Sequence, residues 1–269
     1  MLILETFRTA WRALGANRLR TALTTLGMII GVASVVSMIA VGEGARASVE
    51  GQSRSLGANL LTIRPGAPTR GPVRTGRVET LTLDDAEAIE ELPEVVAVAP
   101  EASGSAQVEY LATNMTSSIV GTTGDYIGVR SFDVAQGLNI TDHDVRTRRR
   151  VALIGSNVAE TLFGDLSPLG ERIQIKGVGF QVIGVLAEKG DSGFSSPDDQ
   201  VLIPVTTFRA FLGIPKGYGE IQVQVRSREM LDTAIAEAKS IVRRMHRTPD
   251  DEPDDFRISS PVRSARAAS

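Results

Sequence analysis

The chain has no cysteine and only two histidines among its 269 residues. Without cysteine it can form no disulfide, no thiol nucleophile and no sulfur-ligated metal site, so its stability must come from packing. A serine triad would have to use His143 or His246, and the nucleophile motif Gly-x-Ser-x-Gly is missing from the sequence. These absences argue against a hydrolytic enzyme.

Nucleotide-binding motifs are missing as well. No lysine follows a glycine anywhere in the sequence, so the chain has no Walker A loop. A dinucleotide fingerprint is excluded at Gly177 and Gly179, because Val182 stands where the third glycine belongs. We therefore expect no cofactor and no ATP hydrolysis by the chain alone. The net charge of -3 argues against nucleic acid as a partner.

One long apolar run, from Thr21 to Gly42, contains no charged residue. As a helix it would reach about 33 Å, close to the roughly 30 Å hydrocarbon core of a bilayer. The run therefore predicts a single membrane-spanning helix over residues 21–42.

The charges around this run predict its orientation. Four arginines precede it: Arg8, Arg12, Arg18 and Arg20. The segment after Gly42 mixes acidic and basic residues, so the positive-inside rule places the N-terminus in the cytoplasm and residues from 43 onward outside the cell membrane. A cleaved signal peptide is the alternative, because Ala45-Arg46-Ala47 has a small-x-small form, but the run is longer than a signal's apolar core.

The predicted membrane helix carries small residues at three- and four-residue steps, which places them on one face. They are Thr24, Gly27, Gly31 and Ser34. Gly27 and Gly31 form the small-xxx-small pattern that lets two helix backbones approach closely, so we predict packing against a second membrane helix. The alternative is that glycine is simply commoner in membrane helices.

Residues 1–20, which precede the apolar run, have an amphipathic pattern. Phe7 and Trp11 lie on one helical face, whereas Arg8 and Arg12 lie on another. Such a helix lies flat at the membrane interface with its arginines toward anionic headgroups. We predict a cytoplasmic elbow helix that leads into the span.

Beyond the membrane, short strands alternate with helices. Residues 172–176 and 180–184 alternate apolar and polar side chains around a glycine-rich turn, which predicts a hairpin with Val182 on its buried face. Helices are expected to begin with caps at Thr82, Ser156 and Ser227. The sequence thus predicts an α+β fold with its own apolar core.

Two polar clusters receive structural interpretations. Asp142-His143-Asp144 is interpreted as a solvated polar turn rather than a metal site, because consecutive side chains rarely converge on one ion. His246 is interpreted as the polar end of the helix over residues 227–247, close to the negative end of its dipole. We expect no metal site and no catalytic residue.

A series of segments in a fixed order resembles a known family. The segments are Arg20 to Val32, Gly42 to Gly44, Leu56 to Leu60, Pro65 to Gly66, Val151 to Gly155, Leu162 to Gly164, Pro168 to Gly170, Phe180 to Val185 and Ile203 to Pro204. Together they look like the first membrane helix and the periplasmic core domain of MacB/FtsX-type ABC transporter permeases. The likeness extends over about residues 1–258.

The resemblance implies an external domain of two αβ parts, one porter-like and one a smaller insertion. The expected organisation is an elbow over 1–20, a membrane helix over 21–42, the core domain over 43–258 with its insertion at roughly 110–215, and a disordered tail over 259–269. It also implies a partner ABC ATPase, a permease homodimer or heterodimer, and an adaptor (membrane fusion) protein as a third candidate partner. ATP binding would then move the external domain to export or extract a substrate.

Two departures from the family keep an alternative open. Leu138 follows Gly137 where members usually carry Gly-Arg, and no second apolar run of spanning length follows Gly42, whereas members have three further membrane helices. We expect a truncated, split or shortened permease. The alternative function is a membrane-anchored binding or interaction module without transport of its own.

Overall fold

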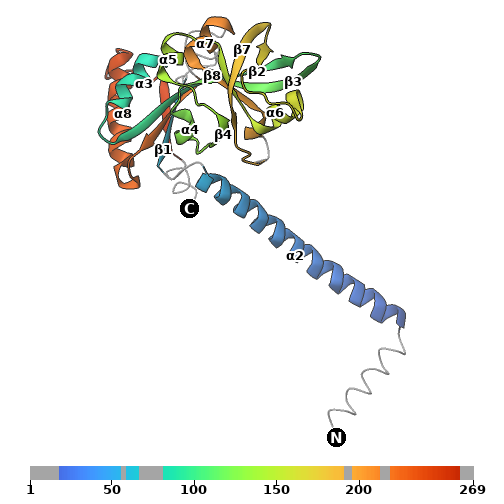
Figure 1. Cartoon of the computed structure of the whole chain (residues 1–269). Coiled ribbons are helices and arrows are strands. Elements are labelled where there is room, and N and C mark those ends of the chain that lie inside the picture. The colour runs from blue at the N-terminus through green and yellow to red at the C-terminus, as the bar shows by residue number, and fades with distance from the viewer. Residues whose placement is uncertain (1–17, 56–58, 67–80, 191–195, 213–218, 261–269) are drawn as a thin grey trace. The chain divides into compact units, whose positions relative to one another are not determined.

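A computed structural model describes most of the chain: residues 18–55, 59–66, 81–190, 196–212 and 219–260. The chain divides into two compact units, Met1–Gln52 and Ser53–Ser269. Figure 1 shows the described part of the first as a long helix and that of the second as a sheet with helices packed on it.

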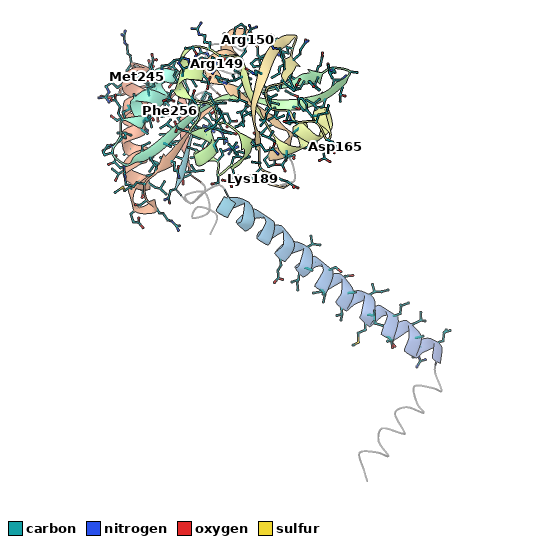
Figure 2. The ribbon with its side chains drawn as sticks, viewed as in Figure 1. Arg149, Arg150, Asp165, Lys189, Met245 and Phe256 are labelled. Atoms are coloured by element: carbon teal, nitrogen blue, oxygen red, sulfur yellow. The ribbon has the colours of Figure 1, made fainter. Side chains whose placement is uncertain are left out.

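The first unit is built on helix α2 (Arg18–Ser55). Within it, Ala22–Gly44 is long and apolar enough to cross a membrane, and it is the only such helix in the described ranges. The described side chains of this helix project on every side (Figure 2) and are exposed. The predicted helix over 21–42 is therefore present, and it continues beyond Gly44. Phe7, Arg8, Trp11 and Arg12 lie outside the described residues.

The described residues of the second unit form ten strands. They are β1 (Leu60–Pro65), β2 (Val95–Tyr110), β3 (Thr113–Thr122), β4 (Val134–Gly137), β5 (Val151–Ile154), β6 (Arg172–Ile175), β7 (Val178–Leu186), β8 (Gln200–Pro204), β9 (Glu220–Val225) and β10 (Phe256–Ser259). They form one mixed sheet in the order β10-β1-β9-β2-β3-β8-β5-β7-β4, with β6 pairing to both β2 and β7. Two pairs are parallel, β3 with β8 and β5 with β7, and the others are antiparallel.

Within the part of this unit that the structure describes, six α-helices and two short 3₁₀ turns accompany the sheet. They are α3 (Leu83–Glu90), α4 (Tyr126–Val129), α5 (Asp142–Arg146), α6 (Ser156–Phe163), α7 (Val205–Phe211), α8 (Leu231–Met245), η1 (Pro197–Asp199) and η2 (Arg228–Met230). Helices α3 and α8 pack against each other at one end of the unit (Figure 1). A mixed sheet with segregated helices is the α+β class that the sequence predicted.

Strand β2 belongs to two half-sheets. Its first part pairs with β9 as far as Glu101, and from Ala102 onward it pairs with β3. The strand is 16 residues long, whereas the sequence pattern predicted a strand only over Val95–Ala99. The change of partner at Ala102 precedes the expected insertion boundary near residue 110, which lies at the end of β2. The division into a porter-like part and an insertion stays a prediction.

The predicted hairpin is confirmed as β6 and β7, which pair from Arg172 with Gln181 to Ile175 with Val178. Its turn is formed by Lys176 and Gly177, one position earlier than expected. Both have positive φ, 50° and 76°, as a two-residue type I′ turn requires. Val182 is 1% exposed, so its predicted burial is also confirmed.

Of the three predicted helix caps, the one at Ser156 is wrong, and Ser227 takes its expected cap position without a side-chain cap bond among the residues described. Helix α6 begins at Ser156 itself, and the cap position is Gly155, with no side-chain cap bond in the described chain. Glycine is required there because a Cβ atom would lie 2.2 Å from the carbonyl oxygen of Asp198. Ser227 precedes the 3₁₀ turn η2 and makes no side-chain cap bond in the described structure.

Residues 142–144 also differ from the expected polar turn, because they form the start of helix α5. Thr141 and Asp144 make a capping box in which each backbone N–H is bound by the other side chain. Arg149, labelled in Figure 2, donates to Asp144 Oδ1 at 2.8 Å. The sequence signal was present, since Thr141 and Asp144 have the same spacing as Thr82 and Asp85.

The C-terminal end of the described chain adds a strand that sequence analysis missed. Strand β10 pairs with β1 from Phe256 opposite Pro65 to Ser259 opposite Thr62. Ser260 is 2% exposed. The expected disordered tail over 259–269 therefore begins too early, and residues 261–269 lie outside the described residues. The apolar periodicity of residues 227–247 places Met245 on one helical face with Leu231, Ala238, Ile241 and Val242. Those four residues are buried in α8, but Met245 is exposed.

Candidate functional site

On the predicted contact face of α2, the hydroxyl groups of Thr24 and Ser34 bond to the backbone of the same helix. Thr24 Oγ1 donates to the carbonyl oxygen of Arg20, and Ser34 Oγ donates to that of Ile30, each at 2.8 Å. At Gly27 and Gly31, no heavy atom of the described chain lies within 4 Å of the position a Cβ would take, once the helix's own backbone is set aside. The hydroxyls are thus satisfied within the helix and leave the glycine surface open. The role of this face in helix packing stays a prediction.

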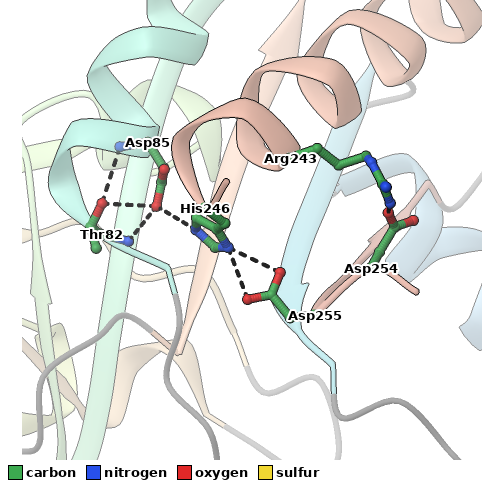
Figure 3. A network of polar contacts seen from close by, with 6 residues as sticks. All are labelled: Thr82, Asp85, Arg243, His246, Asp254 and Asp255. Atoms are coloured by element: carbon green, nitrogen blue, oxygen red, sulfur yellow. Dashed lines mark hydrogen bonds and ion pairs between the residues drawn. The ribbon is translucent and has the colours of Figure 1, made fainter. Parts of the chain in front are cut away.

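A polar network begins in the second unit at the start of α3 (Figure 3). Asp85 N donates to Thr82 Oγ1 at 3.3 Å, and Thr82 N donates back to Asp85 Oδ2 at 2.8 Å. This capping box confirms the cap predicted at Thr82. Asp85 is 1% exposed, so its carboxylate needs partners to remain buried.

His246 supplies one of those partners (Figure 3). Its Nε2 lies 3.1 Å from Asp85 Oδ2, and its Nδ1 lies 2.9 Å from both carboxylate oxygens of Asp255. Burial alone lowers the pKa of this imidazole, but the hydrogen bonds and charges of Asp255 and Asp85 outweigh it, so the pKa of His246 is raised. The imidazole thus joins the C-terminal end of α8, the start of α3 and the segment before β10.

The contacts of His246 form one clamp between α8 and the segment before β10, and a second clamp lies beside it. Arg243 forms an ion pair with Asp254, and Lys239 Nζ lies 2.7 Å from the same carboxylate (Figure 3 shows the Arg243 pair). Burial alone raises the pKa of Asp254, but these two cations lower it overall. Arg243 also donates to the carbonyl oxygen of Glu252 at 3.2 Å. Together these contacts hold the segment 249–255 on α8 and bring β10 into the sheet.

A cleft of about 430 Å³ lies between α3 and α5. Buried apolar side chains form part of its lining, and its rim carries four exposed carboxylates: Glu87, Glu90, Asp125 and Asp142. Burial and the neighbouring acids raise the pKa of Glu90 and of Asp125. The two histidines do not contribute to the lining of this cleft. Within the described ranges, no group of three His, Asp or Glu residues is placed to hold a metal ion.

The polar contacts of His246 and Arg243 join α3, α8 and the segment before β10. Sequence reasoning identified Thr82 and His246 but not their connection, because Asp85 and His246 are 161 residues apart. The partner of His246 on the other side, Asp255, had no recognisable sequence signal at all.

Comparison with known proteins gives a consistent result. The family described as MacB-like periplasmic core domain matches residues 21–241. The chain is 37% identical over 253 residues to the macrolide export ATP-binding/permease protein MacB of Chlorobaculum tepidum, covering 93% of this chain and 39% of that protein. It is 35% identical over 252 residues to the pyoverdine export ATP-binding/permease protein PvdT of Pseudomonas syringae pv. tomato, covering 93% and 38%.

A solved structure shares the fold. The periplasmic region of MacB from Actinobacillus actinomycetemcomitans superposes with a TM-score of 0.67 at 21% identity, covering 80% of this chain and 94% of that one. At this identity the likeness concerns the fold alone. The chain spans about two fifths of the length of the two transport proteins it matches.

Proposed function

The chain belongs to the family of MacB-like periplasmic core domains, and we propose that it is the anchored external part of an ABC transporter permease. The observation that carries the proposal is the order of its parts. The family match begins at residue 21, just before the apolar segment Ala22–Gly44 of α2, and continues through the mixed-sheet unit to residue 241. An apolar helix joined to this domain in one chain is what a permease needs to transmit movement across a membrane.

In this proposal α2 spans the cell membrane with its N-terminus in the cytoplasm. The second unit then lies on the extracytoplasmic side, and the face formed by Thr24, Gly27, Gly31 and Ser34 packs against a second permease chain. The energy comes from an ABC ATPase that acts as a partner of this domain, a proposal supported by the names of the ATP-binding/permease relatives. An adaptor protein on the outer side is a third candidate partner.

The proposed cargo is an exported compound, and no described residue of this chain points to a particular one. The relatives carry names for two different cargoes, a macrolide and pyoverdine. The shared domain therefore supports export as the class of function, with the particular substrate left to the complete transporter.

ATP turnover by the full chain in lipid nanodiscs tests the division of labour. We expect no saturable turnover from the chain alone, and turnover together with co-purification when an ABC ATPase of the same organism is added. The control is the ATPase alone, which gives the basal rate. Saturable turnover by the chain alone that survives repeated purification would contradict the proposal.

A further inference from the structure

The two half-sheets of the second unit meet at a single step along β2. Glu101 is the last residue of β2 that pairs with β9, where it lies opposite Glu220. The next residue, Ala102, is the first that pairs with β3, opposite Gly121. Glu101 therefore lies at the step where β2 changes from one half-sheet to the other.

Two carboxyl groups face each other at this position. Glu101 is 9% exposed, and its Oε2 is buried without a hydrogen-bond partner among the described residues. The Glu220 side chain directly opposite is 14% exposed. Like charges directly opposite on neighbouring strands destabilise a sheet, and a buried unpaired charge is more costly still. The pair is therefore sensitive to whether it holds a proton.

The hydrogen bonds around the pair indicate which carboxyl holds that proton. Glu220 accepts from Arg64 Nε at 2.6 Å through Oε2 and from the Gln222 amide through Oε1. Both oxygens of Glu220 are thus engaged as acceptors. Glu101 has an oxygen with no donor among the residues described, so a proton on Glu101 can be donated to Glu220 instead.

The charged and titratable groups that act on Glu101 come from three elements. They are Glu220 on β9, Arg64 on β1, and Tyr126 and Arg130 at α4. Burial and the charge of Glu220 raise the pKa of Glu101 to about 7, although Arg130 and Arg64 oppose the rise. Burial also raises the pKa of Tyr126, so this phenol stays neutral over the same range. The carboxyl pair is then the group at this junction that changes charge near neutral pH.

We propose that Glu101 and Glu220 form a proton-operated latch that holds the end of β9 against β2 where the two half-sheets meet. With one proton between them, the carboxyls hydrogen-bond and the latch is closed. When that proton leaves, two carboxylates repel each other at the last pair of the β2–β9 ladder, and the latch opens. This inference rests on the geometry of the second unit and not on the transport function.

Hydrogen exchange of the full chain in nanodiscs tests the latch. Exchange rates are measured for peptides covering residues 99–102 and 220–225. The wild-type rate is divided by the rate of Glu101→Gln at the same pH. This ratio removes the intrinsic pH dependence of amide exchange, which is the same in both proteins. Glutamine reproduces the protonated acid and cannot ionise. We expect this ratio to rise about tenfold per pH unit between pH 5 and pH 7 and then to level off.

Two further variants keep the result interpretable. Glu109→Gln removes an exposed carboxylate from the same strand. The wild-type exchange rate divided by the rate of Glu109→Gln should therefore not change with pH. Glu220→Gln removes the opposing charge but keeps Glu101. Its exchange rate should therefore rise with pH at a lower pH than the wild-type rate does, and by a smaller factor. The latch would be overturned if the ratio of wild type to Glu101→Gln stayed constant from pH 5 to pH 8. It would also be overturned if the ratio of wild type to Glu109→Gln changed with pH by an equal amount.

Discussion

His246 Nε2 lies 3.1 Å from Asp85 Oδ2, so the end of α8 is tied to the first turn of α3 across 161 residues of sequence. Asp85 already caps α3 through Thr82, and His246 also contacts Asp255 ahead of β10. One imidazole therefore connects three elements that sequence alone does not bring together.

This connection predicts a pH dependence of stability. The pKa of His246 is raised above its usual value, so the charged imidazole stabilises the fold fully below about pH 6.5, and this contribution is lost as pH rises through the folded-state pKa. We expect His246→Gln to lower the free energy of unfolding by about 2 kcal/mol at pH 6 and by less at pH 9. Urea unfolding at both values measures the difference.

The exposed histidine on α5 provides the control for that measurement. His143→Gln should leave stability unchanged at both pH values. Because wild type and variant are compared at the same pH, the titration of Glu101, which both proteins contain, cancels from the difference. An equal loss for His246→Gln at pH 6 and pH 9 would show that the contact is not charge-dependent.

Burial of the predicted hairpin gives a second prediction. Val182 is 1% exposed on β7, so Val182→Asp places an unpaired charge in the core and should cost about 3 kcal/mol or more. Gln181→Asp changes the exposed neighbouring side chain and should cost less than about 1 kcal/mol. Denaturation midpoints of the two variants compare the positions, and equal midpoints would refute the placement of this strand.

The predictions that succeeded rest on short-range signals. The capping box at Thr82 and Asp85 and the alternation on both sides of Gly177 each lie within a few residues of sequence. The periodicity of α8 likewise located most of its buried stripe. Such signals report local structure because their partners are neighbours in the chain.

The features that were missed depend on distant partners. The second half of β2 contains Ser103, Gly104 and Ser105, which have little strand propensity, and it forms a strand because β3 pairs with it. Strand β10 is acidic just before Phe256 and has no strong pattern, yet β1 and the clamps on α8 hold it in the sheet. No local signal in a single sequence reports these contacts.

The glycine face of α2 gives a prediction about association. Replacing Gly27 and Gly31 together by leucine should separate the backbones of two packed helices and abolish close contact between chains. The matched control is Ala33→Leu with Ala40→Leu, small residues on the opposite side of the helix, which should leave association intact. Cross-linking or FRET between chains in bilayers measures it, with and without an ABC ATPase.

The outcome of that measurement separates the two functional classes. Loss of association only in the glycine variant supports a permease that works with a membrane partner. Association equal in the wild type and in Gly27→Leu/Gly31→Leu would leave α2 as a simple anchor, and the packing role of Thr24, Gly27, Gly31 and Ser34 would be withdrawn.

Protease accessibility in intact spheroplasts tests the central claim most directly, because the proposed permease role requires the second unit to lie on the extracytoplasmic side of the membrane. With one epitope tag at each end of the chain, we predict that added protease removes the C-terminal tag and leaves the N-terminal tag intact until the cells are lysed. A C-terminal tag that stays protected before lysis, or a mature protein that begins at Ser48, would contradict the account.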